Sequence, residues 1–202
     1  CGYEILQTTC PEAMYLYGGE DFIKNFSVEN DFTYGIGPGL GTDYETEEKL
    51  MHFLKNYNEP LVLDADALNL ISKNPENLNL IPKKSIITPH PKEFSRLFGE
   101  SKDSFERLEL AKSKAKELNI YIVLKGHHTQ IITPEGNVFY NITGNSGLAK
   151  GGSGDVLLGI ITSILAQGYS PENAAIFGVW LHGKAADFTA EKHSKEAMLA
   201  SD

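Results

Sequence analysis

Short apolar runs alternate with amphipathic segments along the first half of the chain. Strand-like runs occur at residues 32–36, 61–63 and 86–87, and each is followed by apolar positions that predict a helix. These positions are Leu50, Phe53, Leu54 and Tyr57, then Leu68, Leu70 and Ile71, and then Phe94, Leu97 and Phe98. Such alternation favours an α/β fold with a central, mostly parallel sheet and helices on both of its faces.

The pattern changes after a helix that Leu108, Ala111, Ala115 and Leu118 predict. Strand-like runs at residues 120–124, 129–133 and 138–141 follow with turn residues between them, which predicts an antiparallel edge to the sheet. The remainder predicts two helices, at residues 155–167 and 171–192. The first is apolar on nearly every side, so we expect it to be central and buried.

Composition and charge exclude several classes of protein. The 202 residues are 41% apolar and 22% charged, as in one globular domain with its own core. Cys1 and Cys10 form no CxxC pair, which favours a reducing, cytoplasmic compartment. No apolar stretch is long enough to cross a membrane, and no secretory signal opens the chain. The net charge of −9 argues against nucleic acid as a partner.

Residues 145–155, Asn-Ser-Gly-Leu-Ala-Lys-Gly-Gly-Ser-Gly-Asp, carry the strongest chemical signal. Gly147, Gly151, Gly152 and Gly154 precede a predicted helix, so backbone N–H groups can converge on an anion at its positive end. The alternative is a plain turn in which Asp155 is a helix cap or a first-turn acid. Four glycines exceed the need of a cap, and a carboxylate beside an anion suits a base that accepts a proton from a hydroxyl.

Two commoner phosphate motifs are excluded by spacing. The Gly-Lys pair at 183–184 is followed by Ala185 within a predicted helix, so it is no P-loop. The loop at 35–41 has alternating glycines but not the spacing of the dinucleotide fingerprint. Because it follows a strand, it is either a ligand contact or a tight turn.

Acidic residues follow the run at 61–63. Asp64 and Asp66 could together bind magnesium or a ribose at the carboxyl end of the strand. For Asp66 we favour a structural role, as the cap of a helix that begins at Ala67.

Histidines occur at two further loops. Pro89 and Pro91 fix the backbone around His90 at the start of a helix, which suits either a ligand contact or an ordinary buried or surface histidine. His127 and His128 are adjacent, so on a strand their rings would face opposite ways, and we predict no metal site there. Lys125 and Gly126 precede them and could lie along a polyphosphate, although a solvated hairpin turn is the simpler explanation.

Five motifs, in this order, resemble those of the NAD(P)H-hydrate dehydratases of the ribokinase-like superfamily, which include the carboxyl-terminal half of bifunctional NAD(P)H-hydrate repair enzymes. They are residues 36–41 (IGPGLG), 64–69 (DADALN), 88–93 (TPHPKE), Lys125-Gly126 with Thr129, and 141–155, which ends in GGSGD. The final Gly-x-Gly-Asp alone indicates only the superfamily, whereas the ordered set is more specific. The resemblance implies one ribokinase-like domain over residues 1–202.

The resemblance also implies an activity. Family members phosphorylate the ring hydroxyl of the S epimer of hydrated NADH or NADPH with ADP or ATP, and eliminate phosphate to restore the cofactor. Asp155 would be the base, and Gly152, Ser153 and Gly154 would stabilise the transferred phosphoryl group. Mg²⁺ is expected with the nucleotide, and no metal is expected to be held by the protein itself.

Binding residues follow in the same way. The nucleotide would be held by Lys125, Gly126, His127, His128, Thr129, Asn145, Gly147, Lys150, Gly151, Gly152, Ser153 and Gly154. The hydrated dinucleotide would be held by Gly39, His90, Pro91, Lys92, Glu93 and Asp155.

The resemblance places a further strand and a glycine-rich loop before Cys1, so we expect a domain truncated at both ends. It also implies a homo-oligomer and, in some proteins, fusion to an epimerase domain. Two alternatives stay open. One is a ribokinase-like kinase of another small alcohol, such as a vitamin precursor, and the other is a nucleotide-binding module without catalysis.

Overall fold

A computed structural model describes residues 3–15, 18, 29 and 31–202 of the chain. Cys10 is exposed and free, and Cys1 lies outside the described residues. The chain begins with a helix, α1 (Tyr3–Thr9), which the hydrophobic pattern does not predict.

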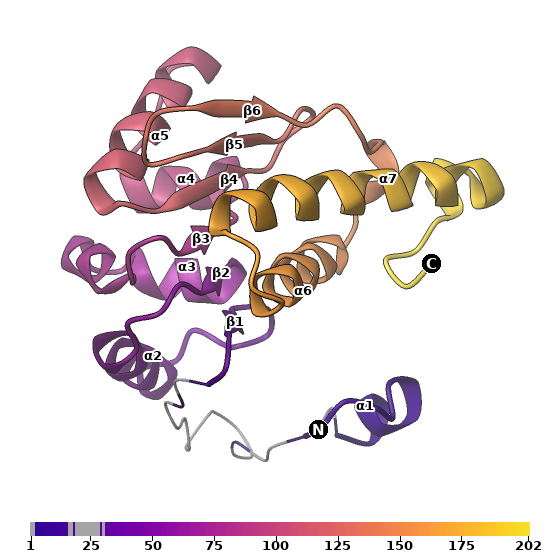
Figure 1. The fold of residues 1–202 in the computed structure, drawn as a ribbon, viewed down its shortest axis with the longest axis horizontal. Helices are drawn as coiled ribbons and strands as arrows, with labels where there is room; N and C mark the ends of the chain where they lie inside the picture. The colour runs from indigo at the N-terminus through magenta and orange to yellow at the C-terminus, as the bar shows by residue number, and fades with distance from the viewer. Residues whose placement is uncertain (1–2, 16–17, 19–28, 30) are drawn as a thin grey trace.

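Six short strands form one mixed sheet in the order of the sequence (Figure 1). They are β1 (Gly35–Ile36), β2 (Val62–Leu63), β3 (Ile86–Ile87), β4 (Tyr121–Leu124), β5 (Gln130–Ile132) and β6 (Val138–Tyr140). The first four are parallel, and β5 and β6 continue the sheet as antiparallel neighbours. The predicted mostly parallel sheet with an antiparallel edge is confirmed.

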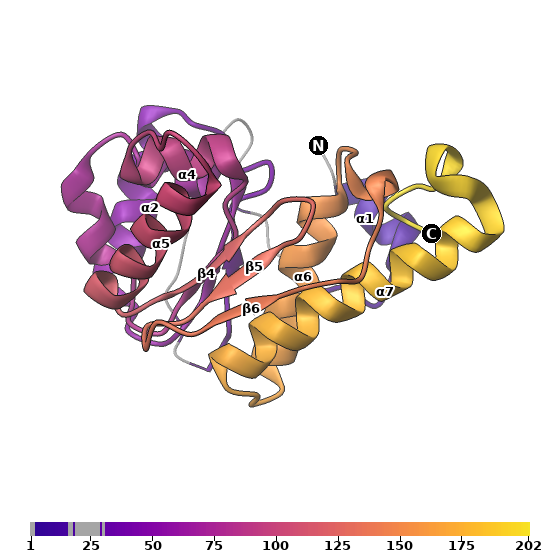
Figure 2. The ribbon, with the colours of Figure 1, turned by 90° about the horizontal axis from the view of Figure 1, so that it is seen from above.

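Helices cover both faces of the sheet, as Figure 2 shows from above. One layer contains α2 (Tyr44–Asn56), α3 (Ala65–Ile71), α4 (Pro91–Phe98) and α5 (Ser104–Leu118), with a 3-10 helix, η1 (Pro75–Leu80), beside them. The other contains α6 (Ser153–Ala166) and α7 (Pro171–Ala197), which follow a short 3-10 turn, η2 (Ser146–Leu148). No helix in the described part of the chain is long and apolar enough to cross a membrane.

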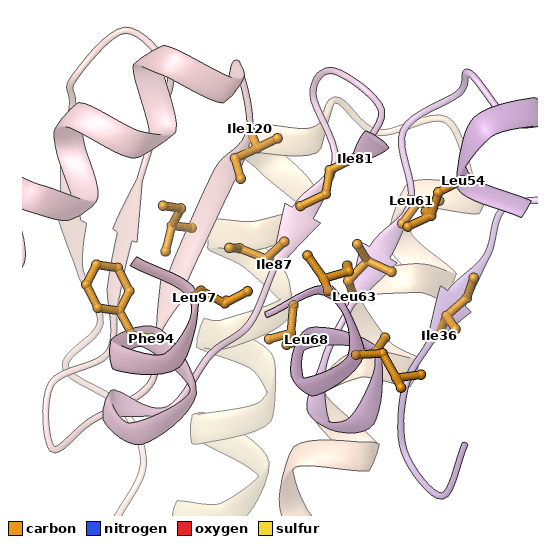
Figure 3. Close-up of a cluster of buried hydrophobic side chains, with 14 of the residues drawn as sticks. Ile36, Leu54, Leu61, Leu63, Leu68, Ile81, Ile87, Phe94, Leu97 and Ile120 are labelled. Atoms are coloured by element: carbon orange, nitrogen blue, oxygen red, sulfur yellow. The ribbon is translucent and has the colours of Figure 1, made fainter. Parts of the chain in front are cut away.

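The alternation of side chains along each strand explains the two layers. Leu61 and Leu63 belong to the larger apolar cluster beneath α2 to α5, part of which is drawn in Figure 3, whereas Val62 packs with α6 and α7. Ile86 and Ile87 divide between the two clusters in the same way. Because neighbouring strand residues point to opposite faces, a run of adjacent apolar residues produces a strand buried on both sides.

Two expectations are corrected. The strand predicted at residues 32–36 is reduced to Gly35–Ile36, and Phe32 is 53% exposed. Helix α6 is not buried all round: Leu157 and Ile161 are buried, but Val156 is 37% exposed. It lies in an outer layer, packed on the sheet and on α7, so its remaining side is uncovered by the described residues.

Close packing of α6 against α7 generates a stability prediction. A Cβ on Gly178 would lie 2.7 Å from Cγ1 of Ile161, whereas one on Gly159 would meet nothing within 4 Å. We expect Gly178→Val to lower the free energy of unfolding by about 1–3 kcal/mol through overpacking. Gly159→Val should change it by less than about 0.5 kcal/mol, since it is a solvent-facing substitution. Urea denaturation measures both, and equal effects would contradict the packing argument.

Candidate functional site

A cavity of about 940 Å³ lies between the ends of several elements. The β4–β5 connection, the loop after β6, the first turn of α6 and the middle of α7 contribute to its wall, and Figure 2 labels these elements. Predicted site residues that line it are His90, Lys125, Gly126, His127, His128, Thr129, Asn145, Lys150, Gly151, Ser153 and Gly154. The folding of the chain thus brings together residues that are far apart in sequence.

Other predicted site residues lie outside this lining. Gly147 is a buried residue of η2, and Gly152 and Asp155 lie directly beside lining residues at the start of α6. Pro91, Lys92 and Glu93 form the first turn of α4, and Gly39 is exposed on the loop after β1. The cavity therefore includes the predicted nucleotide residues more fully than the predicted substrate residues.

The first turn of α6 has the geometry of an anion site. Gly152 is the N-cap with φ of +90°, a left-handed conformation that favours glycine. Ser153 and Gly154 follow within the helix and line the cavity. The first backbone N–H groups of a helix have no intrahelical partner and carry its positive partial charge, so they can bind an anion. Asp155 is the first-turn acid of the helix and is exposed.

Helix α7 fixes the loop that leads to this turn. Asp187 accepts hydrogen bonds from the Gly144 backbone N–H at 2.9 Å and from the Asn145 side-chain amide at 3.0 Å. Asn145 Oδ1 in turn accepts from the Gly147 N–H at 2.9 Å. A Cβ at Gly183 would clash with Thr143, so glycine allows the loop to approach the helix closely. The loop is therefore held in shape by the protein alone.

The pKa of Asp187 reflects these contacts. Partial burial raises it, but the hydrogen bonds from Gly144 and Asn145 and the charges of Lys184 and Lys195 outweigh burial. The pKa therefore lies below its ordinary value of 3.8. Sequence reasoning missed Asp187. Its signal was the four-residue spacing from Gly183, which puts both on the face of the helix that meets the loop.

His182 is a second missed residue of α7. It lines the cavity and forms a hydrogen bond with the backbone of Ser153, at the start of α6. Burial lowers the pKa of His182 and the hydrogen bond raises it, but burial has the larger effect. The pKa therefore lies below its ordinary value of 6.5, and the imidazole is neutral at pH 7.

Lys150 ties the carboxyl-terminal segment to the loop. Its Nζ donates to the carbonyl oxygens of Glu196 and Met198, each at 2.6 Å. A Cβ at Gly147 would clash with Sδ of Met198, so this segment packs directly on the loop. Lys150 lines the cavity, and its ammonium is held by the carbonyl oxygens of the carboxyl-terminal segment.

His90 combines a structural role with a place at the cavity. Its Nδ1 accepts from the N–H groups of Lys92 and Glu93 at 3.1 and 3.2 Å, and Glu93 Oε2 accepts from the His90 N–H at 2.7 Å. This reciprocal capping box, with Pro91 as the first helical residue, begins α4. Nδ1 is therefore an acceptor, which places the ring proton of the neutral form on Nε2.

The two aspartates after β2 serve different partners. Asp64 accepts from Nζ of Lys125 at 2.8 and 3.0 Å, whereas Asp66 accepts from the Gly41 N–H at 3.0 Å. Each carboxylate therefore has a partner of its own, and a joint ligand site of the two stays a possibility that the sequence raised. The expected cap is wrong: α3 begins at Ala65, so Asp66 lies inside its first turn.

The expected divergence of His127 and His128 is wrong as well. Both belong to a loop rather than a strand, and their ring centroids are 4.5 Å apart in an edge-to-face contact. Among the described residues no group of three or more His, Cys, Asp or Glu side chains is placed to hold a metal ion.

The mixed sheet and the glycine-rich start of α6 are those of a ribokinase-like protein, and a solved structure with this fold supports the class. The ADP/ATP-dependent NAD(P)H-hydrate dehydratase from Bacillus subtilis, co-crystallised with ATP/Mg²⁺ and soaked with CoA, aligns with a TM-score of 0.78. It is 34% identical, and the alignment covers 98% of this chain and 72% of that one.

Residues 4–202 match the NAD(P)H-hydrate dehydratase family, and the chain belongs to that family. An ADP-dependent (S)-NAD(P)H-hydrate dehydratase from Neisseria meningitidis is 43% identical over 81% of this chain and 57% of its own length. A bifunctional NAD(P)H-hydrate repair enzyme from Thermofilum pendens is 35% identical over 98% of this chain. The chain spans 38% of that enzyme.

Loss of the Asp187 charge should weaken the loop in a pH-dependent way. Because the folded pKa is lowered, the stabilisation is complete above pH 3.8 and is lost as pH falls through the folded value. We expect Asp187→Asn to lower the free energy of unfolding by about 1 kcal/mol at pH 7, a value reduced because the side chain is partly exposed. At the lowest pH that permits folding, the substitution should change the free energy of unfolding by almost nothing. Urea denaturation across pH measures this. Glu191→Gln, an exposed change on the same helix, should show no such dependence.

Proposed function

We propose that this chain is the catalytic domain of a nucleotide-dependent dehydratase for the S epimer of hydrated NADH and NADPH. The observation that carries the proposal is the preformed anion-binding turn of α6, at a cavity of about 940 Å³, in a chain of this family. The activities named for the Neisseria and Bacillus relatives support the same substrate and the use of ADP or ATP.

Phosphoryl transfer solves the chemical problem of this reaction. The hydrated ring carries a hydroxyl, and hydroxide is a poor leaving group. Transfer breaks the bond between the terminal phosphorus of the nucleotide and its bridging oxygen, and forms a bond from the ring oxygen to phosphorus. Phosphate then leaves with the C–O bonding pair, and the adjacent ring carbon loses a proton, which restores the double bond.

Residues at the start of α6 suit the first of these steps. Asp155 accepts the proton of the ring hydroxyl, and the N–H groups of Gly152, Ser153 and Gly154 stabilise charge on the transferred group. The exposed position of Asp155, one residue after a lining residue, supports a second ligand that approaches the nucleotide from outside the cavity.

The nucleotide occupies the cavity in this proposal. Lys125 to Thr129 and most of residues 145–154 line the cavity. His90 and the first turn of α4, with Gly39, contact the hydrated dinucleotide. Mg²⁺ in phosphoryl-transfer sites keeps several waters and is held largely by substrate phosphates.

Further assembly follows from the relatives. The Thermofilum protein is bifunctional, so fusion to a second catalytic domain is part of the proposal for the whole protein. A homo-oligomer stays a prediction. A cytoplasmic location stays a prediction.

The activity is testable directly. We expect full-length protein to restore the absorbance of reduced nicotinamide from hydrated NADH, with consumption of one ADP or ATP per molecule of cofactor. The measurement is absorbance together with released phosphate. Phosphorylation of a small alcohol such as a vitamin precursor, without recovery of absorbance by either nucleotide, would replace the dehydratase with a kinase.

The base is testable separately. We expect Asp155→Asn to lower kcat by ~10²–10⁴-fold, because it preserves size but removes the proton acceptor. Nucleotide binding, measured by calorimetry, should persist. The matched control is Glu172→Gln, which removes a first-turn acid from α7, outside the cavity lining. An Asp155→Asn protein with more than half the wild-type rate contradicts the assignment.

A further inference from the structure

Asp64 is an almost completely buried carboxylate that its own helix does not use. It is 1% exposed and occupies the N-cap of α3, yet its side chain makes no cap hydrogen bond. Both carboxylate oxygens instead accept from Nζ of Lys125, at 2.8 and 3.0 Å. A buried charge without a partner is strongly destabilising, so the fold requires that this ion pair be formed.

Lys125 has a second acidic neighbour that is equally constrained. Oε2 of Glu93 lies 3.8 Å from Nζ, and the same oxygen is fixed by the His90 backbone N–H. The backbone N–H of Lys125 also donates to the carbonyl of Pro89 at 2.9 Å. The lysine is therefore held by segments that follow β2 and β3, as well as by its own strand.

The held ammonium lies beside the anion-binding turn. A Cβ built on Gly154 would be 3.4 Å from Oδ2 of Asp64 and 3.6 Å from Nζ of Lys125. Both Gly154 and Lys125 line the cavity. These are ordinary van der Waals distances, so the ion pair lies directly against the start of α6.

The net charge of Lys125 and its two acidic neighbours indicates that the group positions an ammonium rather than attracts an anion. Two carboxylates surround one ammonium, so the group has a net charge of −1 and is a poor attractor of free anions. Two acidic partners do, however, fix the position of Nζ more firmly than one. Precise location matters most for a group that acts during transfer, because a displacement of about 1 Å can cost ~10²-fold in rate.

We propose that Asp64 is a positioning residue for the transfer step: it holds Nζ of Lys125 beside Gly154, where the ammonium stabilises the phosphoryl group in flight. This rests on the proposed function. Asp64 does not contact the reacting atoms itself, and acts through Lys125.

The test compares Asp64→Asn, Lys125→Met and the double variant, with kcat, nucleotide KM and melting temperature as readouts. Asp64→Asn should lower kcat by ~10–10²-fold and leave KM within about threefold, since position rather than charge is lost. The double variant should be no slower than Lys125→Met, because both changes act through one ammonium. Independent, multiplicative losses, or an Asp64→Asn protein with unchanged kcat, would overturn the proposal.

A matched control is Glu47→Gln, which removes the carboxylate of another ion pair, with Lys73 at 2.9 Å, outside the cavity lining. It should leave kcat unchanged. If Asp64→Asn fails to fold, Lys125→Arg tests the positioning role instead, because it keeps the ion pair but moves the charge. We expect its kcat to fall at least tenfold and its melting temperature to be preserved. A wild-type rate for Lys125→Arg contradicts positioning.

The proposed function and the role of Asp64 are contradicted by different results. Wild-type protein that leaves hydrated NADH unchanged with both nucleotides contradicts the proposed function, and the transfer step with it. Active wild-type protein whose Asp64→Asn variant is equally active contradicts only the role of Asp64.

Discussion

The site depends on the burial of the parallel strands on both faces. Leu63 packs on one side of the sheet and Val62 on the other, so a polar side chain in this part of the sheet needs a hydrogen-bond partner there, as Ser85 and Thr88 have in the backbone of Leu61 and Leu63. Polar groups therefore gather beyond the carboxyl ends of the strands. Asp64 directly follows Leu63, and Lys125 directly follows Leu124, so the core that excludes them also brings them together.

A second constraint is the contact between the glycine-rich loop and α7. Gly183 allows the loop to approach the helix, and Asp187 holds the loop there through the Gly144 N–H and the Asn145 amide. Backbone N–H groups stabilise a developing charge efficiently only when they are in place before the charge appears. Helix α7 thus fixes the loop that leads to the first turn of α6, and the long helix is part of the cavity wall as well as of the core.

The sequence predicted what local patterns determine. Adjacent apolar residues indicated the strands, and the glycines around Ser153 indicated an anion site at the start of a helix. It did not predict Asp187 or His182, because their roles arise from a helix that packs on a loop some forty residues earlier in the chain, as the Gly144–Asp187 bond shows. The pairing of Asp64 with Lys125 was equally invisible, since it joins residues 61 positions apart that only the sheet order makes neighbours.

Local charge, rather than the net charge of −9, decides how such a protein can bind a polyphosphate. At physiological ionic strength, exposed charges farther away than about 8 Å are largely screened. The first turn of α6 presents backbone N–H groups, which attract an anion without a cation. Lys125, in contrast, is surrounded by Asp64 and Glu93, so its charge adds little to attraction at a distance. The division is chemically useful. Under the proposed function, affinity comes from the backbone groups, which hold the nucleotide before and after transfer, while the rigidly placed ammonium acts on the phosphoryl group between its donor and its acceptor.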